Sequence, residues 1–511
     1  MRSFILPLSF FTLVCIISCN DDEEKKSDTL RPATDIQLNP GGYAPLSAEL
    51  TFTGGLPVEL QVRVVGKHGP ASDAIKVYEP ASQQWKVPVL GLYPDYDNEV
   101  IVTYFDETGS QLLEETFTIR TQPLIEEMPT VDIAVDPGGD IAAGYNLVNY
   151  FGHTGEFLPQ RPFMFDRFGD IRWYLDYSAH PDLSSLFFDN GMILLQNGNL
   201  LFGNGNSGQL YEVDRLGQVI KQYSLQGYGF HHHVIEKPNG NFIVTVNDPG
   251  KPTVEDVIIE INRNNSQIVR TWDLNESLDN QRRAWPTDLA DLNIDWFHAN
   301  ALAFDPTDNS IIVSGRTQGT VKLTENNDLV WILAPHREWE TSGTGQDLRQ
   351  YLLTPLDATS TPLEDPLVLD GTTNHPDFEW SWYQHSPIIL PTGNILQFDN
   401  GDNRNYTGAG PYSRAVEYEI DEDKKTIRQV WTYGKERGTA AYSRIVSKVS
   451  YDEQTNHVLF TPGATSFSGR QMGRVIEIDK SGGNVVFEAT VTPPIAPFSI
   501  TFHNVIRVPL Y

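Results

Sequence analysis

A repeated unit of four strands after Tyr145 constrains the fold of this chain more than any other feature. Each unit pairs two apolar strands across a Gly/Asn turn, such as Pro238-Asn-Gly-Asn241 or Pro391-Thr-Gly-Asn394. Two further strands with alternating polarity close the unit, for example Asp256–Asn262 or Ala415–Asp421 with the strand that follows each. Repeated units of four short strands are typical of propeller blades, and we count six of them. The sequence therefore predicts a six-bladed β-propeller.

The two ends of this repeat region are incomplete in complementary ways. The first blade, from Tyr145 to Tyr174, lacks one strand, whereas the C-terminal segment Ser499–Leu510 begins a blade that nothing continues. We expect the tail to supply the missing strand, because closing the ring removes the exposed edges of an open array.

Residues 33–122 show a different pattern, with about seven short alternating strands such as Ala48–Thr53 and Val58–Val64 between turns. This spacing predicts a small immunoglobulin-like β-sandwich. We interpret residues 123–139 as a linker and residues 140–511 as the propeller domain, so the fold class is all-β.

The N-terminus has the features of a targeting segment. Residues 1–19 combine a basic start, a short apolar run and Ile-Ser-Cys19, which is similar to a bacterial lipobox. Lipidation of Cys19, followed by an acidic tether over residues 20–32, predicts a protein anchored to the outer membrane on its periplasmic or surface face. The other cysteine, Cys15, would leave with the signal, so the mature chain forms no internal disulfide.

Charge excludes one class of partner. With 67 acidic and 37 basic residues, the formal charge of −30 repels the phosphate backbone, so nucleic acid is not expected to bind. An anionic small substrate would need its own local arginine or histidine. The oligomeric state is left open between a monomer and a homodimer.

Histidines recur at one position of the repeat. His232, His385 and His503 each precede a proline by six residues, and His298 has the same order of strand and turn with a turn two residues longer. Inner strands of a propeller converge on the central channel, so we expect His232, His298 and His385 to face one another there. Arg316 lies on the strand beside His298.

These residues and their surroundings resemble the bacterial arylsulfate sulfotransferases. The similarity rests on the order of several short motifs and extends over nearly the whole mature chain. The motifs are Asp-Trp-Phe-His298-Ala-Asn300, Ser-Gly-Arg316-Thr-Gln318, Gln384-His385, Phe398-Asp-Asn-Gly-Asp-Asn-Arg404, Tyr412–Ile420 and Trp431–Arg437.

The resemblance implies ping-pong transfer of a sulfuryl group from a phenolic sulfate ester to a phenolic acceptor, without a nucleotide donor or any cofactor. It assigns His385 as the nucleophile that forms a sulfohistidine, with His298 as acid and base in turn. Arg316 would bind two sulfuryl oxygens, and Asn300 and, if protonated, His232 would supply further donors.

Two departures from the family pattern leave the activity open. His233 stands where the family often has an aspartate, and Thr317 stands where a histidine is common.

An aromatic mouth formed by Trp296, Phe297, Tyr383 and Phe502 would stack the phenols. The insertion over residues 335–379 is expected to cap the channel or to form a contact surface.

Three other interpretations compete with this one. Zinc or copper on the convergent histidines is disfavoured, because the channel is wide and adjacent histidines of a strand alternate faces. Calcium at Asp399–Arg404 is disfavoured against an Asx-rich turn. A catalytically silent surface propeller that binds a glycan or a protein explains the anchor and the acidity, but not Arg316 beside the histidines.

Overall fold

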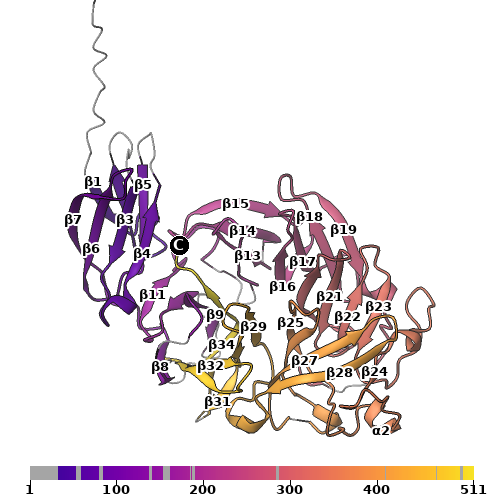
Figure 1. The fold of residues 1–511 in the computed structure, drawn as a ribbon. Helices are drawn as coiled ribbons and strands as arrows, with labels where there is room; N and C mark the ends of the chain where they lie inside the picture. The colour runs from indigo at the N-terminus through magenta and orange to yellow at the C-terminus, as the bar shows by residue number, and fades with distance from the viewer. Residues whose placement is uncertain are drawn as a thin grey trace, which may run out of the picture.

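The computed structural model describes most of the chain after residue 32. The described ranges are residues 33–52, 59–79, 85–136, 138, 141–153, 161–184, 186, 190–205, 207–283, 287–408, 410–467, 469–494 and 499–511. The predicted signal peptide, Cys19 and the tether lie outside them. Figure 1 shows two parts, a ring of radiating sheets and a smaller sandwich beside blade one.

The smaller part consists of two antiparallel sheets, as the alternating pattern predicts. In β3, apolar residues that face the core alternate with half-buried polar ones, which is the burial expected of a sandwich strand. One sheet comprises β1 (Ala33–Leu38), β2 (Ser47–Phe52) and β5 (Trp85–Leu90). The other comprises β4 (Ala74–Tyr78), β3 (Glu59–Val64), β6 (Asp97–Phe105) and β7 (Gln111–Arg120).

Blade one confirms the predicted closure of the ring. It comprises β11 (Ile171–Tyr174), β10 (Phe163–Phe165), β9 (Tyr145–His153) and the C-terminal β34 (Ser499–Val508). β34 pairs with β9 along nine residue pairs, from Ser499 with His153 to Val508 with Tyr145. The tail is therefore the inner strand of the first blade.

Three four-stranded blades follow, and each runs in sequence order from its inner to its outer strand. Blade two comprises β12 (Ile193–Leu194), β13 (Leu200–Asn204), β14 (Gln209–Val213) and β15 (Val219–Ser224). Blade three comprises β16 (Gly229–Glu236), β17 (Phe242–Asn247), β18 (Val257–Ile261) and β19 (Ile268–Asp273). Blade four comprises β20 (Ala299–Asp305), β21 (Ser310–Gly315), β22 (Gly319–Leu323) and β23 (Leu329–Leu333).

Blade five has one strand more than the repeat. It comprises β25 (His385–Ile389), β26 (Ile395–Asp399), β27 (Arg414–Asp421), β28 (Thr426–Tyr433) and β24 (Thr354–Pro355). β24 belongs to the insertion over residues 335–379 and pairs in parallel with β28. This part of the insertion thus extends the outer edge of the blade.

Blade six receives a strand from the segment that the sequence analysis interpreted as a linker. It comprises β29 (Lys448–Asp452), β30 (His457–Thr461), β32 (Arg470–Asp479), β33 (Val485–Thr492) and β8 (Thr130–Val135), with β31 (Thr465–Phe467) paired to β32. The linker interpretation was incomplete because Thr-Val-Asp-Ile-Ala-Val alternates in polarity and pairs with β33.

Helical segments are short and lie between strands. They are α1 (Leu274–Ser277), α2 (Pro366–Leu369) and the 3₁₀ turns Pro70–Ser72, Leu348–Tyr351, Arg404–Tyr406 and Lys435–Ala440. None of the helices in the described ranges has the length and apolar character of a membrane span.

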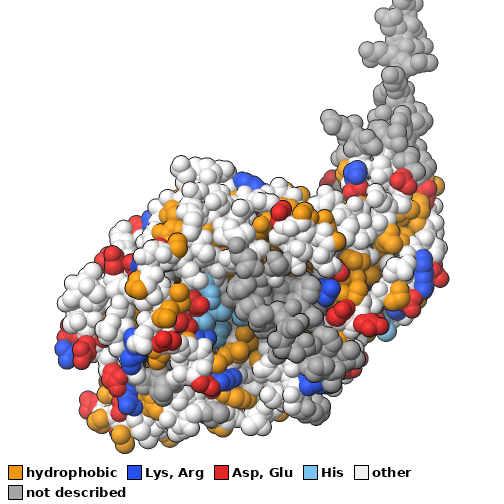
Figure 2. Space-filling view, turned by 180° about the vertical axis from the view of Figure 1, so that it is seen from behind, with side chains coloured by type: hydrophobic (Ala, Val, Ile, Leu, Met, Phe, Trp, Pro, Cys, Tyr) orange, Lys and Arg blue, Asp and Glu red, His pale blue; other side chains and the backbone are white. Residues whose placement is uncertain are grey.

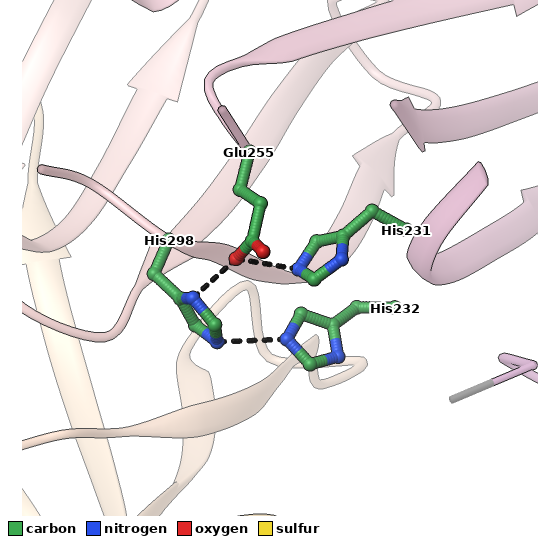
Figure 3. Close-up of side chains that lie close together, drawn as sticks. All are labelled: His231, His232, Glu255 and His298. Atoms are coloured by element: carbon green, nitrogen blue, oxygen red, sulfur yellow. Dashed lines mark hydrogen bonds and ion pairs between the residues drawn. The ribbon is translucent and has the colours of Figure 1, made fainter. Parts of the chain in front are cut away.

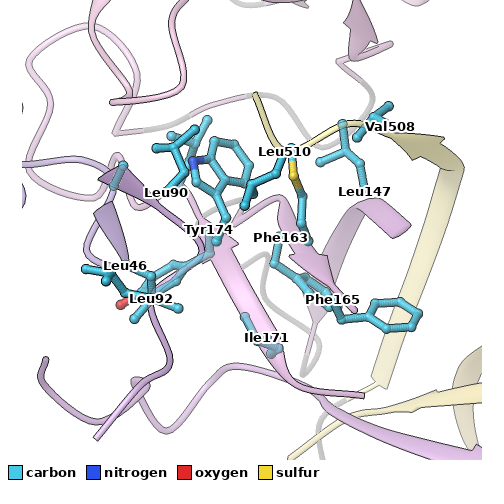
Figure 4. Packing of buried hydrophobic residues seen from close by; sticks show 14 of the residues in the cluster. Leu46, Leu90, Leu92, Leu147, Phe163, Phe165, Ile171, Tyr174, Val508 and Leu510 are labelled. Atoms are coloured by element: carbon cyan, nitrogen blue, oxygen red, sulfur yellow. The ribbon is translucent and has the colours of Figure 1, made fainter. Parts of the chain in front are cut away.

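The sandwich packs on blade one through a continuous apolar core. Figure 4 shows Leu90 and Leu92 of the sandwich together with Tyr174 and Leu510 of blade one. The buried Arg172 donates to the carbonyl of Gly91 at 2.7 and 2.9 Å and pairs with Asp166 at 2.9 Å. Because a buried guanidinium is stable only when its donors are satisfied, this contact fixes the sandwich on the ring.

Candidate active site

A cavity at the mouth of the channel receives residues from all six blades. Figure 2 shows histidine side chains in a hollow on one face of the molecule. The lining residues are Gly191, His232, His233, Asn300, Ala301, His385, Ser386, Ser447, Lys448, His503 and Asn504. Each lining residue lies in an inner strand or within two residues before one, in agreement with the register that the repeat predicts.

Bulges at this level distort the inner strands. The pairing register shifts between Phe230 and Val234, and again between His385 and Ile388. Left-handed backbone accompanies the shifts, with φ of 50° at His232 and 55° at Ser386. Such conformations are unfavourable for residues other than glycine and gather at functional sites. The bulges matter because they turn side chains out of normal strand alternation.

His385 is held in a single tautomer. Its Nδ1 lies 3.0 Å from the carbonyl oxygen of Tyr383 and 2.8 Å from Oδ1 of Asn400. The Asn400 amide is itself oriented, since its Nδ2 donates to the carbonyls of Ser443 and Val446. With two acceptors at Nδ1, the proton is on that nitrogen and Nε2 keeps its lone pair. Burial lowers the pKa of His385 to about 3, so the ring is neutral.

His232 and His298 share a proton. Their Nε2 atoms lie 2.8 Å apart, so one ring donates and the other accepts. Burial and the neighbouring imidazoles hold the pKa of His232 well below its ordinary value. Burial also opposes a charge on His298, but the carboxylate of Glu255 outweighs it and raises the pKa of His298. The proton therefore resides on His298 and the His232 ring is neutral, so the condition under which the sequence made His232 a charged donor is not met.

Glu255 joins His298 to His231, as Figure 3 shows. Its Oε2 lies 2.6 Å from Nε2 of His231 and also contacts Nδ1 of His298. The rings of His231 and His232 have centroids only 3.7 Å apart, so the bulge brings adjacent residues to one cluster. The expectation that His231 and His232 alternate faces is wrong here, but His233 stays outside the cluster, so the three adjacent histidines do not all converge on one point. We call His231, His232, Glu255 and His298 the histidine–glutamate cluster.

Arg316 lies behind His298. One of its terminal nitrogens donates to Oδ2 of Asp295 at 3.0 Å, and the same oxygen lies 2.9 Å from Nδ1 of His298. The backbone N–H of Arg316 donates to the carbonyl of His298 at 3.1 Å. The predicted neighbourhood of Arg316 and His298 is thus confirmed. One N–H of the Arg316 guanidinium is already hydrogen-bonded to the carboxylate of Asp295.

Asn300 is the bulged residue of β20 and faces the cavity. Its Nδ2 donates to the carbonyl of Gln384 at 2.9 Å, and the Gln384 side chain donates to the carbonyl of Gly315 at 2.8 Å. These bonds tie the strand of Asn300 to the residue before His385.

Lys448 is a cavity residue that sequence reasoning missed. In the described part of the chain, no carboxylate lies within ion-pair distance of its ammonium, and burial alone lowers its pKa to about 8. Lys448 is half-buried by its accessible surface, and a partly desolvated cation without a counterion favours an anionic ligand. His503, with its ring centroid 5.5 Å from that of His232, was found by spacing but was left out of the site. No comparable motif marks Lys448.

The comparisons with known proteins decide the family. The family model described as Arylsulfotransferase (ASST) matches residues 143–497, and the one described as Arylsulfotransferase Ig-like domain matches residues 35–122. The chain belongs to the arylsulfotransferase family. Both parts of the arylsulfotransferase fold seen in the structure thus have a matching family model.

Two curated relatives span this arylsulfotransferase almost completely. Arylsulfate sulfotransferase AssT of Escherichia coli O6:H1 is 28% identical, and that of Lelliottia amnigena is 27% identical. Each alignment covers 89% of this chain and 90% of the relative. Among solved structures, a catalytically inactive virginiamycin B lyase of Staphylococcus aureus aligns with 9% identity over 71% of this chain and 99% of its own, with a TM-score of 0.34.

The aromatic mouth expected from the sequence is wrong. Trp296, Phe297, Tyr383 and Phe502 are all fully buried, and none lines the cavity. The Phe297 ring lies against Gly315, where a Cβ would approach it to 2.6 Å. These rings therefore pack the inner strands of the arylsulfotransferase propeller.

The two family departures have structural roles here. Nδ1 of His233 accepts the backbone N–H of Leu302 in blade four at 3.1 Å. The hydroxyl of Thr317 donates to the carbonyl of Trp296 at 2.5 Å. Each residue links neighbouring segments of the arylsulfotransferase propeller.

Proposed function

We propose that this chain is an aryl-sulfate sulfotransferase that works by a ping-pong mechanism through a sulfohistidine at His385. The observation that carries this proposal is the tautomer of His385, whose Nδ1 is held by two oxygen acceptors while Nε2 keeps its lone pair beside a cavity. A neutral imidazole with one free nitrogen is a competent nucleophile. The names of the two curated relatives support the same substrate class, phenolic sulfate donors and phenolic acceptors.

In the first half-reaction, Nε2 of His385 attacks the sulfur, and the bond from sulfur to the phenolic oxygen breaks. The departing oxygen takes a proton, so a neutral phenol leaves and the sulfuryl group stays on His385. His298 holds that proton, and His232 lies between His298 and the cavity. We assign His232 as the relay, which donates from Nδ1 while accepting from His298 at Nε2.

The second half-reaction reverses these steps. An incoming phenol gives its proton to His232, which returns a proton to His298, and the phenolic oxygen attacks the sulfur. The bond from nitrogen to sulfur then breaks and restores His385. His298 alternates between acid and base, and its raised pKa favours the protonated form that the first half-reaction requires.

Lys448 and Asn300 are the cavity residues best placed for the sulfuryl oxygens, with Arg316 adding positive charge behind His298. The ammonium of Lys448 supplies charge, and the second N–H of the Asn300 amide supplies a directional donor. An ester sulfate bound there would raise the pKa of Lys448, because a nearby anion favours its charged form.

The test is release of nitrophenol from 4-nitrophenyl sulfate by the purified chain, with and without added phenol. We expect a burst of one nitrophenol per chain without phenol and continuous release with it. The trapped protein should gain the mass of one sulfuryl group on the peptide that contains His385. Continuous release that ignores phenol would indicate a hydrolase, and no release with any aryl sulfate would favour the silent binding protein.

A further inference from the structure

The histidine–glutamate cluster gathers four metal-binding side chains. One donor atom from each of His231, His232, Glu255 and His298 lies within 4.8 Å of every other. His231, His232 and Glu255 belong to blade three, and His298 directly precedes the first strand of blade four. The inner strands of both blades are hydrogen-bonded to their neighbours. Figure 3 shows their polar atoms turned toward one another. The arrangement is therefore built into the rigid inner part of the ring.

The backbone is distorted to make this cluster. His232, Glu255 and His298 have left-handed φ angles of 50°, 60° and 57°. Each such residue costs on the order of 1 kcal/mol or more, so the gathering of side chains is not a by-product of regular strand geometry. Two of the four members, His231 and Glu255, neither line the cavity nor touch the sulfuryl group in the proposed reaction.

The donor set has a chemical preference. Imidazole nitrogens together with one carboxylate oxygen are ligands of Zn²⁺, which binds them at about 2.0–2.2 Å in tetrahedral sites. Calcium and magnesium prefer sets made of oxygen alone. Asp295 adds a supporting contact, since its Oδ2 lies 2.9 Å from Nδ1 of His298. A carboxylate behind a ligating histidine is the usual outer partner in zinc sites.

We propose that His231, His232, Glu255 and His298 form a zinc site at which Zn²⁺ takes the place of the protons that the cluster shares. Donor atoms that are now 2.6–2.8 Å apart must separate by about half an ångström around the ion, a movement within the reach of side-chain rotation. The ion is an inhibitor and not a cofactor. It occupies the nitrogens of His232 and His298 that carry the proton in transfer, and this second half of the inference rests on the proposed function.

Zinc retention tests the site without any substrate. The full chain is stripped of metal with EDTA, loaded with ZnCl₂ and freed of unbound metal. Its zinc content is then measured by inductively coupled plasma mass spectrometry. We expect one zinc per chain, and a weaker affinity by about 100-fold or more in Glu255→Gln and in His231→Asn, since losing even an outer partner costs 10–100-fold. A matched control is His457→Gln, which changes another buried histidine paired with a glutamate, Glu477, at 2.8 Å. That variant should retain zinc like the parent chain.

Thermal unfolding separates lost binding from lost folding. Zinc should raise the unfolding temperature of the parent chain and of His457→Gln, but not of Glu255→Gln or His231→Asn, which should each melt cooperatively without metal. Absence of retained zinc in the parent chain, or equal retention in the two cluster variants, would overturn the site. With the site established, zinc should inhibit nitrophenol release reversibly. Release unaffected by saturating zinc would overturn the inhibitory role alone.

Discussion

Two buried charged clusters in the same propeller differ in how their charges are paired. In blade five, the fully buried Arg414 donates to Asp399 at 2.7 Å and to the carbonyl of Glu379 at 2.9 Å, and Arg404 donates to Asp399 at 2.9 Å. Despite its burial, Glu379 has a pKa lowered to about 2 by Arg414 and Lys435. Each charge in this blade-five ion cluster has an opposite charge beside it.

The channel mouth is in part less buried and is paired differently. Its histidines share protons with one another and with Glu255, and Lys448 has no counterion in the described part of the chain. Full pairing fixes protonation and stabilises a fold, whereas shared protons and an uncompensated cation leave capacity for a reaction. In the Asp399–Arg404 turn considered for calcium, the carboxylate of Asp399 is already paired with two arginines.

The largest expected effect separates the nucleophile from the surrounding structure. Changing His385 to Ala should lower phenol-dependent turnover by about 10⁴-fold or more, because no other group accepts the sulfuryl group. Stability should change little, since the ring borders a cavity. Steady-state kinetics and unfolding curves, with His457→Gln as the control outside the cavity, measure both. Turnover close to that of the parent chain would place the nucleophile on another residue.

In blade five, we expect a substitution to reduce the stability of the fold. Changing Asp399 to Asn leaves two buried guanidinium groups without their shared carboxylate and should lower the free energy of unfolding by about 3–5 kcal/mol. Urea unfolding followed by tryptophan fluorescence measures it. An unchanged unfolding midpoint would contradict the view that this cluster is structural.

Lys448 provides the matched test at the channel mouth. Changing it to Met should slow transfer by about 10–100-fold, the worth of one hydrogen bond to a charged group. The variant should be as stable as the parent chain or more stable, because a half-buried charge without a counterion is removed. Kinetics at several donor concentrations, with urea unfolding, test both parts. A marked loss of stability with full activity would assign Lys448 to the structure.

Sequence reasoning reached the ring, its closure and the level of the histidines because these follow from strand periodicity. It placed His232, His298 and His385 together for the same reason, whereas Asn300 was assigned only through the family resemblance. It failed where the backbone leaves that periodicity. The bulge in β16 carries His231 into the cluster against alternation, and the turn before β18 brings in Glu255, which has no spacing relation to any histidine. The four aromatic residues assigned to the mouth are buried in the core instead.

Arg316 tests how much of the site depends on guanidinium geometry. Changing it to Lys keeps the charge but loses the fork that contacts Asp295, so both half-reactions should slow by about tenfold. Burst kinetics resolve the first half-reaction, and varied phenol concentration reports on the second. If only the first half slowed, Arg316 would act on the donor and not on the sulfuryl group common to both steps.

The smallest expected change in rate at low pH comes from changing Glu255, and the pH dependence of that change identifies its role. Its carboxylate raises the pKa of His298, so protonated His298 persists to higher pH and the rate of the first half-reaction falls only as pH rises through that pKa. Changing Glu255 to Gln should move this alkaline limb about one pH unit lower while leaving the rate near pH 5.5 almost unchanged.

The same pair predicts a stability window with a defined sign. A raised pKa on His298 stabilises the fold below the ordinary histidine pKa of about 6.5, and this contribution is lost as pH rises through the raised value. Burial opposes the charge on Glu255, but His231 and His298 hold its pKa well below the ordinary value, so its contribution is present above about pH 4.3 and lost as pH falls through the lowered pKa. The stability deficit of Glu255→Gln should therefore be largest between these limits and shrink in alkali. A deficit that is constant from pH 5 to pH 9, with an unmoved alkaline limb, would show that Glu255 acts by packing and that His298 takes its proton affinity from Asp295.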